Sequence, residues 1–160
     1  MGLIQLPTFK MRPDEQIVPL QFNHLLSLEL GPHEKEYARN IPGYLDYVFE
    51  NSEQGWSWAA IGRGKVICVF GVRDWWPGVV EAWFLPGEGL ENHARSTLVG
   101  ARALLGEIIS QSGVRRMQIF VKCDHMVALK FAKALYFEVE STHRKFGPEG
   151  ADYYSMVRFE

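Results

Sequence analysis

A long apolar stripe followed at once by an alternating segment constrains the fold more than any other feature of this sequence. Between residues 92 and 112, apolar side chains recur every three or four positions, as they do on one face of a helix. Residues 115–123 then place Met117, Ile119 and Val121 at every second position, which predicts a strand. A strand that follows a helical crossover pairs in parallel with the strand before it. The sequence therefore predicts a sheet that contains a parallel pair.

Three segments before this helix are rich in aromatic and β-branched residues, at 56–61, 65–72 and 79–85. Glycines separate the first two segments, and the run 74–78 forms a turn before the third. These segments predict an antiparallel meander of three strands. All five tryptophans lie in this part of the chain, where they either line a cleft or fill the core. They are Trp56, Trp58, Trp75, Trp76 and Trp83.

The remaining elements are predicted from weaker signals. Residues 3–11 are expected to form a strand, and residues 21–30 and 34–50 two helices. Asn92 is expected to cap the long helix and Gly113 to end it. Asp124 is expected to cap a second helix that turns five side chains inward, with strands following at 138–145 and 153–159. The five side chains are Val127, Ala128, Phe131, Ala132 and Leu135.

Composition excludes several classes of protein. The 160 residues, 47% hydrophobic and 22% charged, predict one domain over residues 1–160. A net charge of −2 gives no strong signal for nucleic acid, and no apolar run is long enough to span a membrane. Cys68 and Cys123 sit in or at the end of apolar runs, which favours a reducing compartment and thus the cytoplasm. No spacing of metal ligands and no nucleotide-binding loop is recognisable.

The order of these elements resembles the GNAT superfamily of N-acetyltransferases, most sharply over residues 79–159. This resemblance implies an α/β (α+β) fold: a mixed, mostly antiparallel sheet with helices on both faces and a splayed pair of parallel strands. It also implies an acyl-coenzyme A-dependent N-acyltransferase, with acetyl-coenzyme A or another acyl-coenzyme A as cofactor and an amine as acceptor.

Four short runs are similar to small GNAT-like proteins of short-tailed bacteriophages, some of which are internal virion proteins. The runs are Trp83-Phe84-Leu85, His93-Ala94-Arg95, Leu135-Tyr136-Phe137 and Phe146-Gly147-Pro148-Glu149-Gly150. This narrower resemblance implies an alternative, in which a non-catalytic GNAT scaffold serves the virion or binds a phage or host protein. The protein would then be found in the host cytoplasm or in the virion.

In the superfamily, the backbone of the strand before the long helix binds the pantetheine arm of the cofactor. The residues that match this strand segment are Ala82, Trp83, Phe84 and Leu85. The pyrophosphate rests on the start of the long helix, where N–H donors and the helix dipole favour an anion. The family motif at this helix start is Arg or Gln, then two residues, Gly, one residue, and Gly or Ala. On this chain the three specified positions are Gly89, Asn92 and Ala94, and only Ala94 agrees with the motif.

Other residues near the expected helix starts add possible ligand contacts. Gly87 and Gly89 leave the loop free to approach a phosphate, and His93 and Arg95 offer side-chain donors. His125, near the start of the following helix, offers a donor to the ligand or to the reacting carbonyl. An ordinary loop leading into a capped helix explains the same residues equally well. The cofactor interpretation predicts a phosphate or other anion within reach of the Ala94 or Arg95 backbone.

Acyl transfer to an amine requires a base and an acid. Glu81, in an otherwise apolar strand, matches the position of the base, and Trp83 beside it would remove water from the carboxylate. A carboxylate on the solvent face of a strand is the alternative. Tyr136 is the candidate acid, although it also suits packing at a helix end, and Tyr153 and Tyr154 are equally available by proximity.

Overall fold

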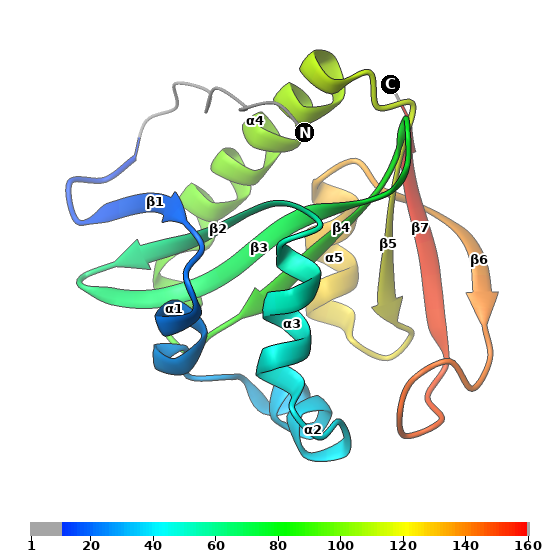
Figure 1. Cartoon of the computed structure of the whole chain (residues 1–160), viewed down its shortest axis with the longest axis horizontal. Coiled ribbons are helices and arrows are strands. Elements are labelled where there is room, and N and C mark those ends of the chain that lie inside the picture. Colours follow the sequence, from blue (N-terminus) through cyan, green and yellow to red (C-terminus); the bar gives the residue numbers. More distant parts are fainter. Residues whose placement is uncertain (1–10, 160) are drawn as a thin grey trace. The chain divides into compact units, whose positions relative to one another are not determined.

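The computed structural model describes residues 11–159, which form seven strands, five α-helices and one short 3₁₀ helix (Figure 1). Residues 3–10 of the predicted first strand lie outside the described chain, and residue 11 is not in a strand. The elements are β1 (Glu15–Pro19), α1 (Phe22–Ser27), α2 (Pro32–Asn40), α3 (Tyr44–Ser52), β2 (Gly55–Gly62), β3 (Lys65–Trp76), β4 (Val79–Pro86), η1 (Leu90–His93), α4 (Ala94–Ser112), β5 (Arg116–Lys122), α5 (Met126–Ala134), β6 (Glu138–His143) and β7 (Tyr153–Phe159).

The strands form one mixed sheet in the order β1-β2-β3-β4-β5-β7-β6. The pairs β1–β2, β2–β3, β5–β7 and β6–β7 are antiparallel, whereas β4 and β5 are parallel. The helix α4 connects the two parallel strands along the chain. The predicted mixed, mostly antiparallel sheet with one parallel pair is therefore confirmed.

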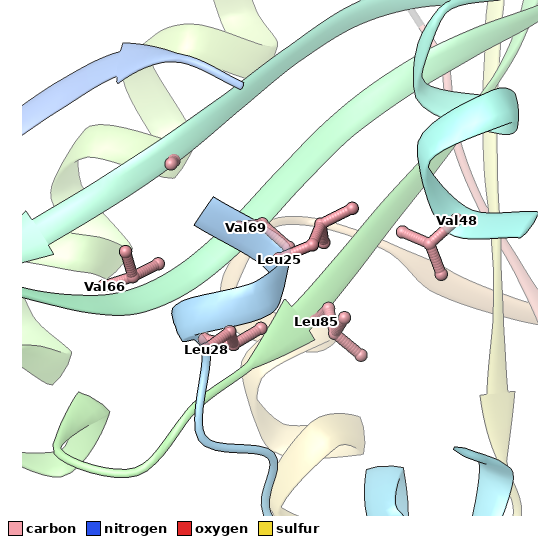
Figure 2. Close-up of a cluster of buried hydrophobic side chains, with 7 residues drawn as sticks. Leu25, Leu28, Val48, Val66, Val69 and Leu85 are labelled. Carbon is pink, nitrogen blue, oxygen red and sulfur yellow. The ribbon is translucent and has the colours of Figure 1, made fainter. Parts of the chain in front are cut away.

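The described chain divides into two compact units, residues 11–74 with 82–97 and residues 75–81 with 98–159. In the first of these, side chains from α1, α3 and the strands β2, β3 and β4 form a buried cluster, which Figure 2 shows. Its members are Leu25, Leu28, Val48, Ala59, Val66, Val69 and Leu85. Cys68 belongs to a second buried cluster, together with Ala60 and Ile67.

In the other unit, the central strands β5 and β7 carry the most deeply buried side chains. Met117 and Met156 are both 0% exposed, and Ile108 on α4 is equally buried. The alternation that predicts β5 and the stripe that predicts α4 thus mark real core positions. Gly113, with φ of 63°, follows the last residue of α4, as predicted for a helix that ends in a left-handed residue.

The N-terminal half differs from its prediction. Three short helices replace the expected two, because Gly43 takes a left-handed conformation with φ of 68° and separates α2 from α3. The strand β1 was not predicted, since its five residues carry two polar side chains and end in a proline. The strand β3 extends to Trp76, so the predicted turn is shorter and centres on Pro77 and Gly78.

The predictions for the helix caps are wrong in detail. Asn92 does not cap α4 but lies inside η1, whose N-cap is Gly89 with φ of 94°. The N-cap of α5 is His125, not Asp124, and its side chain accepts a hydrogen bond from the Ala128 N–H at 3.4 Å. Val127, predicted to point inward, is 75% exposed, because α5 begins one residue later than expected and Leu129 takes the buried face.

Candidate active site

The start of the strand β4 pairs in parallel with β5. The register pairs within one compact unit are Val79↔Arg116, Val80↔Met117 and Glu81↔Gln118, and β4 continues to Pro86. Residues 82–86 belong to the other unit, where Ala82, Trp83 and Phe84 are half-buried and Leu85 is buried. The segment from Ala82 to Leu85 remains the predicted position of the backbone contacts with the pantetheine arm.

Glu81 lies in this parallel pairing, and its side chain is held by a tryptophan. The indole Nε1–H of Trp75 donates to Oε2 of Glu81 at 2.8 Å. Glu81 is half-buried, while Trp75 is 45% exposed and packs edge-to-face on Trp76 with ring centroids 5.6 Å apart. A carboxylate fixed in this way at a partly open position is suited to act as a base. The Trp75 contact was not predicted from the sequence.

The helical turn before α4 provides a small group of backbone donors. The N–H groups of Leu90 and Asn92 donate to the carbonyls of Gly87 and Gly89. Among the hydrogen bonds of residues 11–159, the N–H groups of Gly89 and Glu91 have no acceptor. Helical structure thus begins at Leu90, four residues before the position where an anion was predicted from the sequence. Ala94 and Arg95 follow on α4 with exposed side chains.

The side chain of His93 is engaged by a residue that was not predicted from the sequence. Its Nδ1 lies 3.1 Å from Oε2 of Glu15, and the Ser96 hydroxyl donates to Oε1 of the same carboxylate at 3.1 Å. The His93 and Glu15 side chains are 3% and 4% exposed. Glu15 on β1 therefore anchors the start of α4. No local signal identifies this contact, because the two residues are 78 positions apart.

Replacing Gly62 with alanine should break this anchor. A Cβ at Gly62 would lie 2.6 Å from Cε1 and Nε2 of the His93 ring, so the ring would have to leave Glu15. Overpacking of this kind costs about 1–3 kcal/mol of the free energy of unfolding, which a urea titration measures. Gly106→Ala is the matched control, because its Cβ would meet nothing closer than 3.9 Å. Equal stability of Gly62→Ala and the unaltered protein would contradict the prediction.

His125 and Tyr136 lie at the two ends of α5. Tyr136 follows α5 with φ of 69°, and its 59% exposed ring lies near the guanidinium groups of Arg102 and Arg158. His125 caps α5 with its ring, as described above. The other two candidate acids, Tyr153 and Tyr154, lie on β7 as buried and half-buried residues.

Several charged side chains around β5 have specific partners. Arg116 forms a bidentate contact with Glu140, which lowers the pKa of that carboxyl group. The Nζ atom of Lys122 lies 3.7 Å from Oε1 of Glu149, and Arg115 donates to the carbonyl of Pro77.

Among the described residues, no group of His, Cys, Asp and Glu side chains could hold a metal ion. Within the same part of the chain, every helix is too short or too polar to cross a membrane.

A mixed, mostly antiparallel sheet whose one parallel pair is connected through α4 defines a GNAT-like fold. Among solved structures, this chain is similar to Ard1 from Thermoplasma volcanium, with a TM-score of 0.72, 12% sequence identity and coverage of 91% of this chain and 97% of that one. A GNAT family acetyltransferase from Bacillus anthracis gives a TM-score of 0.71 at 12% identity, covering 98% and 97% of the two chains.

A third similar structure was solved with its ligand. This GNAT family acetyltransferase from Elizabethkingia anophelis, with acetyl-coenzyme A bound, gives a TM-score of 0.64 at 12% identity and covers 93% of this chain and 100% of that one. No protein-family model and no curated protein sequence matches this chain. The narrower resemblance to phage proteins has no counterpart among these three structures.

Proposed function

We propose that this protein binds acyl-coenzyme A and transfers the acyl group, such as acetyl, to an amine. The observation that supports this proposal best is the GNAT-like sheet, which the chain shares at a TM-score of 0.64 with an acetyltransferase that was solved with acetyl-coenzyme A bound. The end of β4 leads directly to a turn in which the N–H groups of Gly89 and Glu91 have no acceptor among the hydrogen bonds of residues 11–159.

The residues present fit the two polar parts of such a ligand. The backbone of Ala82, Trp83, Phe84 and Leu85 would pair with the pantetheine amides, and the N–H groups of Gly89 and Glu91 would hold the pyrophosphate. Gly87 supports this turn from within, because its N–H is already bonded to the Ile67 carbonyl at 2.9 Å. Asn92, Ala94, Arg95 and His125 remain predicted ligand contacts. The His93 ring faces Glu15, so its role in the proposal is to position the helix start.

The chemistry requires two proton transfers by the protein. When bound, the acyl-coenzyme A supplies a thioester whose C–S bond breaks as the C–N bond forms. The carboxylate of Glu81 takes the proton that the amine nitrogen loses, and Trp75 holds that carboxylate in place. Tyr136 is proposed to return a proton to the leaving sulfur. The contacts of its ring are with Arg102 and Arg158, so Tyr136→Phe tests this role by turnover alone.

Binding is tested by isothermal titration with acetyl-coenzyme A, for which we expect a saturable signal. Ala94→Glu should weaken this binding about tenfold or more, because it puts a carboxylate at the exposed helix start where the pyrophosphate would lie. Thr142→Glu adds the same charge at an exposed position on β6 and serves as the control. Absence of binding at millimolar ligand, or equal binding by the two variants, would count against the proposed site.

A further inference from the structure

Two arginines converge on the end of α5 from different elements. Arg102 on α4 donates from Nε to the Ala134 carbonyl at 2.7 Å, and Arg158 on β7 donates from Nη1 to the Leu135 carbonyl at 3.4 Å. Their guanidinium carbons lie 5.0 Å and 5.4 Å from the centroid of the exposed Tyr136 ring. These three side chains, which we call the arginine clasp, come from positions that are not close in sequence.

Among residues 11–159, no carboxylate forms an ion pair with Arg102 or Arg158 of the arginine clasp. Burial lowers the pKa of Arg158, but a guanidinium stays protonated at neutral pH. The carbonyl end of a helix carries only about −0.5 charge. Two guanidinium groups at that end therefore leave a local excess of about +1.5.

Within the part of the chain that the structure describes, most hydrogen-bond donors of the clasp also have no acceptor. A guanidinium group has about five N–H donors, and each of these two uses one of them on a carbonyl. Both side chains are half-buried, so water screens them less than it screens a fully exposed arginine. If the two arginines only capped α5, each would need one N–H donor, and their full positive charge would not be needed. The clasp therefore has more donors and more charge than a structural cap requires.

We propose that the arginine clasp is a binding site for the phosphate group of a small phosphomonoester. A phosphomonoester carries about −1.5 to −2 charges at neutral pH, which matches the local excess. Its oxygens accept paired N–H donors from guanidinium groups in fork geometry. A carboxylate would supply one charge and two oxygens, and would leave part of the excess unbalanced. This inference uses neither Glu81 nor the start of α4, and it shares only Tyr136, the proposed acid, with the proposed acyl transfer.

Inorganic phosphate is the probe for this site. In a ¹⁵N–¹H spectrum of the full chain, the Nε–Hε signals of Arg102 and Arg158 should shift in a saturable way on titration with phosphate. Arg102→Met and Arg158→Met should each weaken phosphate binding about tenfold or more in a calorimetric titration. Arg116→Met is the matched control, because Arg116 is already paired with Glu140 and its loss should not change phosphate binding.

The titration is repeated with saturating acetyl-coenzyme A to separate this site from the proposed cofactor site. Unchanged phosphate binding in the presence of acetyl-coenzyme A supports a separate site. Competition between the two ligands would show that phosphate binds in the proposed cofactor site, and this result would overturn the inference. Shifts that do not saturate, or equal affinity in the Arg102, Arg158 and Arg116 variants, would overturn it too. If a methionine variant folds poorly, Arg158→Lys replaces it. Lysine keeps the positive charge but lacks the paired N–H donors of a guanidinium group, so it should still weaken phosphate binding. The phosphate titration followed by the spectrum of the unaltered protein does not depend on any variant.

Discussion

Glu81→Gln should lower the turnover of acetyl-coenzyme A with an amine acceptor about a hundredfold while leaving the affinity for acetyl-coenzyme A unchanged. Glutamine keeps the shape of the side chain, and its amide oxygen still accepts from the Trp75 indole that lies 2.8 Å from the carboxylate. It cannot take a proton from the attacking amine. The loss should therefore appear in kcat and not in the binding constant.

The measurement is a thiol-release assay at saturating cofactor, together with a calorimetric titration of the same preparation. Glu138→Gln makes the identical change at an exposed position on β6 and should leave both quantities unaltered. Unchanged turnover in Glu81→Gln would remove Glu81 from the mechanism. Weakened cofactor binding with unchanged kcat would instead assign it a binding role.

Gly55→Ala should lower the free energy of unfolding by about 3 kcal/mol or more, which is a larger loss than we expect for Gly62→Ala. A Cβ at residue 55 would lie 1.9 Å from the carbonyl oxygen of Val72 and 2.9 Å from the Cα of Arg73. These are backbone atoms of the paired strand β3, so no side-chain rotation can relieve the clash. The strands β2 and β3 would have to separate at their first register pair.

A urea titration followed by tryptophan fluorescence measures this loss as a lower midpoint. Gly31→Ala is the control, because its Cβ would meet only the carboxylate end of Glu34, which can move. A midpoint for Gly55→Ala equal to that of Gly31→Ala would contradict the prediction.

Local patterns in the sequence predict much of the C-terminal half. The strand predicted at 153–159 has the observed bounds of β7, and the one predicted at 79–85 is one residue shorter than β4. These segments carry strong alternation or aromatic and β-branched residues, and turn residues flank them, so short-range physics decides their structure. In the N-terminal half, α2 begins at Pro32 and Pro42 lies between α2 and α3, so the helices are short and their local signals are weak.

The candidate site is less predictable because its contacts join distant parts of the chain. Glu81 was identified by its place in a strand, but its hydrogen bond with Trp75 depends on how the hairpin between them closes. Glu15 was not identified, since its partners lie about eighty residues away. Such contacts arise when the sheet assembles, and no spacing within one element encodes them.

Because Cys68 is deeply buried, its reaction with a thiol reagent reports transient opening of the strands around it. The thiol is 0% exposed, and burial raises its pKa to about 12, so the folded state contains almost no thiolate at this position. A thiol reagent can label Cys68 only during excursions that expose the strands around it, whereas the partly exposed Cys123 can be reached without such an excursion. The ratio of the two labelling rates would thus report how often β3 opens in the native ensemble, and no cysteine has to be introduced by mutation.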